Sequence, residues 1–590
     1  MSQISIPFVS ERQNTSWKPS EPPSLEGINE VCLDTETNGL MWQKGDLPIG
    51  ISIRLPNGRC QYLPWGHSGG NLDEETVHRW ARKELRFKHI IGMNTRFDIH
   101  MLYQWGVDLE AQGCTVSDVS HYAALLDDHR KGNSLEAISQ DYLGYGKIQG
   151  LDGSQMALYH AADVAAYAEQ DVRLVGELTK KMWPVLESQD LLRVIQLEND
   201  VIFPVCEMER NAACLDMPLL AKWLKEADEA YLECLWSIHR ESGWKIEPTK
   251  SSDMARLFYA LGIKVIHFTD NGSPSFTDDI LKKIDHPVVQ LARRARKLAS
   301  LKSKYLVPYN KLATDGKLHF NLHQMRGDWE GGSGGTITGR FSSSDVNIQQ
   351  VMRPDKHKDS FGEEFMIREL FIPQSGLFLS ADAAQIEYRL FAHFAESPQI
   401  LAAYAKDPKT DFHNIVMEMV KTVKSDITRK RTKDLNFAFI YGAGKNKISL
   451  MLGIPNTESD QLVDIYMERF PEAKQLLRRK SRAAETDGFV TTLLGRRSRF
   501  PDRSRMHKAL NSVIQGSAAD INKIKLVELF QERKRLGLKM RFTVHDEVCG
   551  DVPDEEAAKM VDEVLNRQSL DLNVPILWET GYGKNWKEAK

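Results

Sequence analysis

The spacing of apolar residues predicts alternating strands and helices in the first third of the chain. Val31 to Leu33 is a short apolar run that leads into a polar turn, and Ile49 to Leu55 alternates apolar with small or polar residues, as strands do. From about Asp73 the spacing becomes helical, and strand-like and helical segments then interleave to about residue 187. We therefore expect an α/β domain of ordinary size, preceded by a loose polar arm over residues 1–24.

The remainder of the chain has mostly helical spacing, interrupted by two strand-like segments. These segments are the apolar run Leu377–Asp382 and the hairpin-like stretch Met540–Val552. Helical periodicity dominates from Leu191 to Leu312, from residue 383 to about residue 536, and near Glu555–Asn566. The pattern therefore predicts a multidomain protein that combines α/β and α+β regions.

Length and composition agree with several folded domains. The chain has 590 residues, of which 42% are hydrophobic, so a mainly disordered chain is excluded. At roughly 100–200 residues per domain, this length indicates about three to five domains. No apolar run approaches the roughly 18 residues that a membrane helix needs, which excludes an integral membrane protein. The first residues also lack the layout of a signal peptide.

The cysteines indicate a reducing compartment. There are seven, they are widely scattered, and none forms a CxxC pair. This usage is typical of free thiols and argues against a zinc ribbon or a disulfide scaffold. We therefore expect a cytoplasmic protein, in a bacterial cell or in the cytoplasm of a phage-infected host, and not a secreted one.

The net charge of −4 taken alone argues against a nucleic-acid partner, but the charge is unevenly distributed. Arg293–Lys304 holds six basic residues and no acid, and Arg478–Lys508 holds ten basic residues against three acids. Tracts of this kind can follow a phosphate backbone. The alternative is a pair of solvated helix faces, which remains open at this point.

Acidic residues in the first domain have the spacing of a metal site. Asp34 and Glu36 lie two apart at the end of a strand, so both side chains point to the same face. Asp98 follows in GMNTRFDIHML, and Tyr167 and Asp171 share one face of a predicted helix. Like charges on one face are unfavourable unless a cation or proton joins them. Four oxygen donors of this type can hold two hard divalent cations.

The order DxE, NxxxD and YxxxD resembles the proofreading 3′→5′ exonuclease domain of DnaQ/RNase D-like nucleases. The resemblance implies an RNase H-like domain in which Tyr167 positions the attacking water. It further implies four metal ligands, namely Asp34, Glu36, Asp98 and Asp171. Tyr167 and these four acids would form the catalytic set of the exonuclease.

Three segments of the second half carry further chemistry. Asp382 ends an apolar strand and precedes a helix, a place where a carboxylate can bind a metal. Arg429, Lys433, Phe437 and Tyr441 recur every four residues, so they share one broad helix face. Cations of this kind suit a triphosphate, and aromatic rings suit a base or sugar. A solvated amphipathic helix is the alternative for this segment. His545, Asp546 and Glu547 lie at the predicted turn of the hairpin.

Together these segments resemble the family A DNA polymerases, a group that includes bacterial DNA polymerase I and many phage polymerases. Motif A is DxxQIExR from Asp382 to Arg389, motif B is RxxxKxxxFxxxYG from Arg429 to Gly442, and motif C is HDE from His545 to Glu547. TxTGRFSS (336–343) and TLLGRRSRFP (492–501) also fit. The resemblance implies a right-hand polymerase with thumb, palm and fingers after the exonuclease domain.

The resemblance implies a role for each matching residue. Asp382 and Asp546 would hold two Mg²⁺ ions, and Glu547 and Lys433 would complete the catalytic set of the polymerase. Glu387 would be the steric gate that occupies the space of a ribose 2′-hydroxyl. The residues expected to contact the incoming nucleotide are Arg429, Lys433, Phe437, Tyr441, Gln385, Glu387 and His545. The residues expected to contact primer and template are Arg340, Asn347, Gln349, Asn511, Gln515, Arg496 and Arg497.

The expected domain order follows from the motifs. It is an N-terminal arm (1–24), the exonuclease domain (25–187), a mainly helical thumb region leading into the palm (188–330), the first part of the palm with motif A (331–395), the fingers with motif B (396–505) and the second part of the palm with motif C (506–590). The chain begins almost directly with the exonuclease, which leaves no room for a separate 5′-nuclease domain and favours a phage-type replicative enzyme.

The expected activity is template-directed addition of dNTPs to a primer 3′-hydroxyl, with 3′→5′ proofreading at a second site. The expected partners are primer–template DNA and dNTPs, with two Mg²⁺ ions at each site that Mn²⁺ can replace. We expect a monomer without membrane contact; accessory replication proteins are possible but unidentified. Three alternatives remain open: an exonuclease whose polymerase half only binds DNA, a bacterial repair polymerase, and a catalytically silent DNA-binding or processivity protein.

The motif B aromatic residue gives a prediction about sugar selection. Phe437 has no hydroxyl group, so the enzyme should discriminate against 3′-dideoxynucleotides better than it would with a tyrosine at this position. We expect Phe437→Tyr to increase dideoxynucleotide incorporation, measured as the ratio of terminated to extended primers. An unchanged ratio would contradict the assignment of Phe437 to the sugar.

Overall fold

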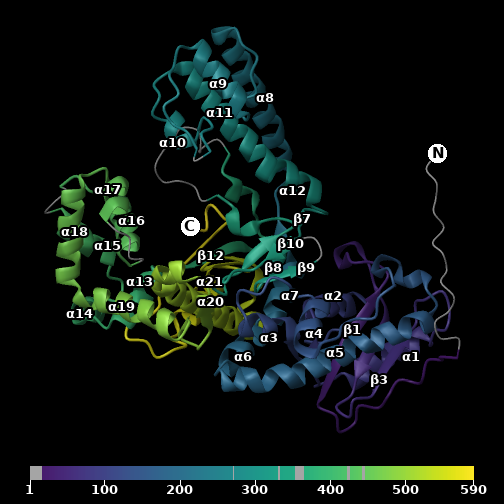
Figure 1. The fold of residues 1–590 in the computed structure, drawn as a ribbon. Helices are drawn as coiled ribbons and strands as arrows, with labels where there is room; N and C mark the ends of the chain where they lie inside the picture. The colour runs from purple at the N-terminus through teal and green to yellow at the C-terminus, as the bar shows by residue number, and fades with distance from the viewer. Residues whose placement is uncertain (1–15, 270, 330–331, 353–364, 422–424, 441–444) are drawn as a thin grey trace.

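The computed structural model describes residues 16–269, 271–329, 332–352, 365–421, 425–440 and 445–590. In Figure 1 the N-terminal helices and strands lie at the lower right, α8, α9 and α11 rise at the top, and α14 to α19 form a second group of helices at the left. A sheet with α20 and α21 lies between these groups. None of the helices in the described part of the chain has the length and apolar character that a membrane crossing needs.

The first domain is built on a five-stranded sheet in the order β3-β2-β1-β4-β5. β1 pairs antiparallel with β2 and parallel with β4, so the sheet is mixed. Its strands are β1 (Glu30–Thr37), β2 (Pro48–Arg54), β3 (Cys60–Pro64), β4 (His89–Gly92) and β5 (Thr115–Asp118). Its helices are η1 (Trp42–Lys44), α1 (Glu74–Glu84), α2 (Thr95–Gln104), α3 (Val119–Leu126), α4 (Leu135–Leu143), η2 (Gly153–Leu158) and α5 (Ala161–Ser188). The predicted α/β character of this region is confirmed.

Local sequence explains where these elements begin. Val31, Cys32 and Leu33 are buried in β1 because this strand lies in the middle of the sheet. Helix α1 starts after Asp73, whose carboxylate accepts a hydrogen bond from Thr76 N at 2.9 Å. A capping acid satisfies a backbone N–H that has no partner inside the helix. The long helix α5 packs on β1, β2 and β3, and so covers the sheet beside the end of β1.

A helical region follows the first domain. α8 and α11 pack side by side and enclose a small core of their own with α9, formed by residues such as Ile238, Leu257, Phe258 and Val289. The elements of this region are α6 (Leu192–Asp200), α7 (Ile202–Asn211), α8 (Met217–Ser242), α9 (Ser251–Ala260), α10 (Asp278–Leu281), α11 (Pro287–Leu301), η3 (Lys302–Leu306) and α12 (Val307–Leu312). The predicted helical dominance is confirmed.

The central sheet, defined here as β15-β16-β12-β17, is antiparallel throughout. Its strands are β12 (Leu377–Ala383), β15 (Lys539–Val544), β16 (Glu547–Val552) and β17 (Trp578–Gly583). The predicted strand at 377–382 and the predicted hairpin at 540–552 are thus confirmed. Helices α20 (Ala509–Leu536) and α21 (Glu555–Asn566) pack against this sheet. Phe378, Phe542 and Trp586 meet in its core.

The left-hand group in Figure 1 is helical and follows β12. Its elements are α13 (Ile386–Ala395), α14 (Pro398–Lys406), α15 (Phe412–Val420), α16 (Arg429–Ile440), α17 (Lys445–Leu452), α18 (Asn456–Arg469) and α19 (Pro471–Thr486). Short strand pairs complete the fold: β6 (Ala213–Cys214) with β7 (Lys317–Leu318), β8 (Asn321–His323) with β11 (Ser342–Ser344), β9 (Gly327–Trp329) with β10 (Gly332–Gly334), and β13 (Phe489–Thr491) with β14 (Arg497–Arg499). Single turns of helix are η4 (Ile348–Gln350), η5 (Ile367–Leu370) and η6 (Arg503–Lys508).

A buried ionic cluster joins α6, the helix after the first domain, to α20 beside the central sheet. Arg496 Nη2 lies 2.5 Å from Glu198 of α6 and 2.7 Å from Asp520 of α20. Lys523 Nζ lies 2.6 Å from the same Glu198 oxygen, and Thr492 Oγ1 donates to Asp520 at 2.6 Å. All four charged side chains are at most 3% exposed. The expectation that Arg496 contacts DNA is therefore wrong, because its guanidinium is buried and fully engaged.

The two basic tracts also have internal partners. In Arg293–Lys304, the buried Arg293 donates from Nε and Nη2 to the Asp278 carboxylate at 2.6 and 3.0 Å. Lys302 pairs with Asp228. In Arg478–Lys508, Arg497 donates to Gln189 O at 2.9 Å, at the end of the first domain. Arg497 remains partly exposed, so its expected DNA contact stays a prediction. The cations of this tract that stay exposed lie on α19 and η6, and they are Arg478, Arg479, Arg482, Arg503, Arg505 and Lys508.

The buried cluster gives a prediction about stability. Arg496→Met should lower the free energy of unfolding by about 3–5 kcal/mol, because it leaves buried carboxylates without their main partner. Urea unfolding of the purified protein measures this change. Arg505→Met is the matched control, since the Arg505 side chain is 63% exposed and its ion pair with Asp502 is solvated. Equal unfolding midpoints for the two variants would contradict the account.

Candidate active sites

Three acidic side chains converge at the end of β1. Asp34 and Glu36 lie on one face of β1, and Asp171 reaches them from α5. One oxygen from each of these carboxylates lies within 4.8 Å of the others. Hard cations such as Mg²⁺ are bound by carboxylate oxygens in this kind of arrangement. The residues therefore fit a divalent cation, and we call them, with Asp98, the first carboxylate site.

Asp98 lies beside this trio but is held differently. It belongs to α2, and its Oδ1 accepts hydrogen bonds from the Thr35 backbone N at 2.9 Å and from the Thr35 hydroxyl at 2.6 Å. Its side chain is buried, and its charge acts on Asp34. The structure thus brings all four predicted acids together, three as a compact set and Asp98 as a neighbour tied to β1.

The acids of the first carboxylate site are strongly perturbed. Burial, together with the neighbouring acids, raises the pKa of Asp34 well above its ordinary range. Burial and the charge of Asp171 raise the pKa of Glu36 to about 8. Burial also raises the pKa of Asp98 to about 7 and that of Asp171 to about 6. Such a group of buried like charges is stable only with protons or with a cation among them.

A lysine already lies against this group. Lys147 Nζ is 2.7 Å from Asp171 Oδ2 and 4.7 Å from the ring centre of Tyr167. Burial raises the pKa of Tyr167 to about 12, so its hydroxyl stays neutral. Lys147 was not found by sequence reasoning, because it lies in a loop between α4 and η2 without regular spacing to the acids.

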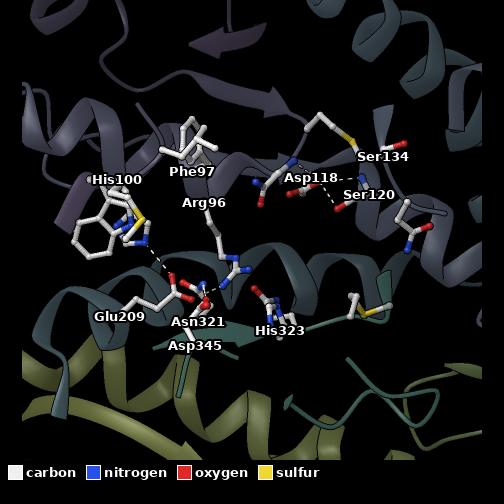
Figure 2. A pocket seen from close by; sticks show the side chains of 18 of the residues that line it. Arg96, Phe97, His100, Asp118, Ser120, Ser134, Glu209, Asn321, His323 and Asp345 are labelled. Atoms are coloured by element: carbon white, nitrogen blue, oxygen red, sulfur yellow. Dashed lines mark hydrogen bonds and ion pairs between the residues drawn. The ribbon is translucent and has the colours of Figure 1, made fainter. Parts of the chain in front are cut away.

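A pocket of about 670 Å³ opens beside the first carboxylate site. It runs from Asp34, Lys147 and Asp171 to the segment around β8, and thus lies between the first domain and the chain that leads to the central sheet. Figure 2 shows Arg96 and His100 reaching from the first domain to Glu209 on the opposite wall. Their nitrogen atoms lie 2.7 and 2.9 Å from the Glu209 oxygens.

Aromatic rings form one end of the pocket. The Trp42 ring is stacked on His100 with centroids 4.1 Å apart, and it meets His319 edge-on at 5.7 Å. Phe97 and His323 also line the cavity, as Figure 2 shows. The pocket therefore offers both ring faces and polar groups within reach of the carboxylates.

The second carboxylate site lies at the end of the central sheet and consists of Asp382 and Asp546. Asp382 on β12 is paired in register with Glu547 on β16, and Ala383 N donates to Asp546 O at 3.1 Å. The pairing brings the two aspartates to the same edge of the sheet. Because both offer carboxylate oxygens at adjoining strand ends, they fit divalent cations.

The turn that carries Asp546 is held by a glutamine. Gln349 Nε2 donates to Thr543 O at 2.5 Å, and its Oε1 accepts from His545 N at 2.9 Å. His545 has a positive φ of 58°, which is uncommon outside glycine and asparagine and needs such support. Gln349 was expected to contact DNA; it is instead 7% exposed and committed to this turn. That expectation is corrected.

Glu547 begins β16 directly after Asp546. Its side chain is fully buried and receives hydrogen bonds from Ser380 at 2.6 Å and Trp586 Nε1 at 2.7 Å. Burial alone would raise the pKa of Glu547, but the Arg368 and Lys590 charges lower it below its ordinary value. Both Glu547 oxygens contact protein donors, so the residue supports the strand end in this structure, and its catalytic role stays a prediction.

The other residues predicted for the polymerase lie on several elements. Arg340 is paired with Glu387, and Gln385, with a φ of 52°, precedes α13. Arg429 and Lys433 are exposed on one face of α16, and Arg429 Nε lies 2.6 Å from Asp411 Oδ2. Asn347 is exposed, and Asn511 and Gln515 are partly exposed on the first turns of α20. Tyr441 and the side chain of Phe437 lie outside the described residues.

The raised pKa values predict how stability depends on pH without metal. The folded state keeps protons on Glu36, Asp98 and Asp171 that the unfolded chain releases, since these pKa values lie near 8, 7 and 6. The unfolding free energy of the EDTA-treated protein should therefore fall as the pH rises from 5 to 8. Each group that still holds its proton contributes roughly 1.4 kcal/mol per pH unit.

Chemical denaturation at several pH values measures this dependence, with Mg²⁺ added in a parallel series. Mg²⁺ should stabilise the protein more at pH 8 than at pH 5.5, because fewer protons compete there. A variant with Asp34→Asn and Glu36→Gln is the control and should lose most of the slope. A slope that is the same in this variant as in the parent protein would contradict the assignment.

Comparisons with known proteins agree with this geometry. A family model described as DNA polymerase family A matches residues 218–588, and one described as 3′-5′ exonuclease matches residues 23–187. DNA polymerase DpoZ of Salmonella phage PMBT28 is 28% identical, over 96% of this chain and 98% of its own length. DNA polymerase I of Pseudomonas aeruginosa is 27% identical, over 96% of this chain and 64% of its own length.

A solved structure has the same fold. It is the POL domain of Pol1 from M. smegmatis in complex with DNA primer-template and dNTP, with a TM-score of 0.78 and 23% identity over 95% of each chain. The family model of the polymerase covers more than half of the 590 residues. The chain therefore belongs to DNA polymerase family A, and it is a DNA-directed DNA polymerase that carries a 3′→5′ exonuclease domain before its polymerase domain.

Proposed function

We propose that the second carboxylate site catalyses nucleotide addition and that the first catalyses removal of a mispaired 3′ end. The observation that supports this division is the presence of two separate carboxylate sites, one at the end of β1 and one at the end of β12. We propose Mg²⁺ as the ion, two at each site, with Mn²⁺ able to replace it, because the donors are carboxylate oxygens. When bound, such ions supply charge that activates the attacking oxygen and stabilises the leaving one.

The side chains around Asp382 and Asp546 suit a nucleoside triphosphate. Arg429 and Lys433 present two exposed cations on one face of α16, which suits a triphosphate. Glu387 is fixed by its ion pair with Arg340, so it can act as a steric gate against a ribose 2′-hydroxyl. Phe437 would pack against the incoming sugar and base, and Tyr441 would lie at the templating position.

The side chains around the first carboxylate site suit hydrolysis of a 3′-terminal phosphodiester. The neutral hydroxyl of Tyr167 can orient the attacking water, while Asp34, Glu36, Asp98 and Asp171 hold the ions. We propose that the adjoining pocket receives the unpaired 3′ end of the primer. Its ring faces, Trp42 above all, suit stacked bases, and its length reaches from Asp171 toward β8.

The proposed domain bounds and DNA contacts follow from the same separation of a polymerase site and an exonuclease site. We propose the domain bounds 25–187 for the exonuclease, 188–330 for the thumb region, 396–505 for the fingers, and 331–395 with 506–590 for the palm. Primer and template would follow Arg340, Asn347, Asn511 and Gln515, together with the exposed cations of α19 and η6. We propose a monomeric replication enzyme that acts in the cytoplasm, where all seven cysteines would stay free thiols.

Separate losses of the two activities test the proposal. Asp382→Ala or Asp546→Ala should reduce extension of a labelled primer by about 1,000-fold or more, because several kcal/mol of charge stabilisation are lost at about 1.4 kcal/mol per tenfold. The same variants should degrade a mismatched primer at the normal rate. Asp34→Ala combined with Glu36→Ala should show the reverse pattern.

Matched controls make the result specific. Asp345→Ala changes an exposed acid on the opposite wall of the pocket and should leave extension within about twofold of the parent enzyme. Loss of both activities in either set of variants, with an unchanged urea unfolding midpoint, would refute the two-site proposal. Persistent extension by Asp382→Ala would favour the alternative that the polymerase half only binds DNA.

A further inference from the structure

A lysine outside all three polymerase motifs lies on the metal-binding edge of the central sheet. Lys590 Nζ is 3.2 Å from Asp382 Oδ2 and 3.1 Å from Glu547 Oε2. Its side chain is 26% exposed, so the ammonium is partly withdrawn from water. A cation so close to a carboxylate experiences a strong attraction, because partial burial lowers the effective dielectric constant. Lys590 thus takes a position at which a divalent ion would meet Asp382.

The chain segment 584–590, called the closing segment here, fixes the position of this lysine by its packing. Trp586 is fully buried, and its backbone N donates to Phe371 O at 2.9 Å. The Trp586 ring packs against Phe371 and Phe542, and its indole N–H donates to Glu547. Figure 1 shows the end of the chain close to β12.

Glycines on β17 allow the closing segment to approach. A Cβ atom at Gly581 would lie 2.2 Å from Ala589 O, and one at Gly583 would lie 2.6 Å from the Cβ of Glu588. Backbone contact of this kind admits no side chain. Glu588 and Ala589 therefore pack directly against β17, and the position of Lys590 follows from that packing.

Lys590 contacts two carboxylates, Glu547 and Asp382. Glu547 already has a buried partner, since Arg368 Nη1 lies 3.1 Å from it and the Arg368 guanidinium is 3.8 Å from the Trp586 ring centre. Ser380 and Trp586 donate to Glu547 as well. Glu547 is therefore held by several groups besides Lys590. The contact of Lys590 with Asp382 is the one that involves a proposed metal ligand.

We propose that Lys590 is a positioning residue that holds Asp382 in place before metal binding and opposes divalent cations at the second carboxylate site. This rests on the proposed role of Asp382 as a metal ligand. Lys590 thereby raises the divalent-ion concentration that the site requires. A neutral side chain of similar length at this position removes the competing charge, so the site should bind a divalent ion more tightly.

The test measures Mn²⁺ binding directly, without nucleotide or DNA. Electron paramagnetic resonance reports free Mn²⁺, and a background with Asp34→Ala and Glu36→Ala removes the first carboxylate site. In this background Lys590→Met should lower the dissociation constant for Mn²⁺ by about fivefold to tenfold. Lys590→Gln should act in the same direction, and Lys590→Arg should stay within about twofold of the parent protein because it keeps the charge.

Lys587→Met is the matched control, because Lys587 belongs to the same closing segment but pairs with Glu369 instead of the aspartates. It should leave Mn²⁺ binding unchanged. The inference is overturned if Lys590→Met and Lys590→Gln bind Mn²⁺ like the parent protein, or if Lys587→Met gives the same gain. If Asp382 is not a metal ligand, a different result is expected: Asp382→Asn would then leave Mn²⁺ binding in the same background unaltered.

Discussion

Repulsion between carboxylates that are gathered at a strand end is the constraint on which both active sites depend. At the end of β1, burial raises the pKa values of all four acids, and the charges of neighbouring site acids add to the rise at Asp34 and Glu36. At the end of β12, protein cations relieve it, since Arg368 and Lys590 lie against Glu547, and Lys590 also lies against Asp382. In each site a lysine contacts an acid that would hold a metal ion, Lys147 in one and Lys590 in the other. The fold thus assembles sites whose charge is balanced only when a cation is present.

If one primer end is to bind at both sites in turn, the two sites must keep a fixed distance and orientation. The buried cluster of Glu198, Arg496, Asp520 and Lys523 joins the helix after the first domain to the helix under the central sheet. The Arg96–Glu209 pair spans the pocket from α2 of the first domain to α7, which follows that domain. Buried ion pairs are costly to break once formed, so these contacts hold the first domain against the polymerase half. The arginine that looked like a DNA contact is one of the residues that fix this geometry.

The sequence predicted the parts of the structure that depend on local patterns. The β1 strand, the β15–β16 hairpin and the last helix follow from short apolar runs and turn residues, and the acids at strand ends follow from motif spacing. Arg496 and Gln349 were assigned to DNA from the family resemblance, because the sequence does not show which buried groups their side chains contact. Their partners lie 24 to 298 residues away in the chain. Lys147 and Lys590 were missed for the same reason, because only tertiary packing brings them to the acids.

The central claim is that two separate groups of carboxylates each bind divalent cations. Anomalous diffraction from crystals of the protein soaked in Mn²⁺ tests this claim most directly, because it locates the ions without relying on activity. The account predicts anomalous peaks among Asp34, Glu36 and Asp171, and a second set between Asp382 and Asp546, with Lys147 and Lys590 displaced from the acids they now contact. Peaks at only one of these places, or peaks at neither, would contradict it.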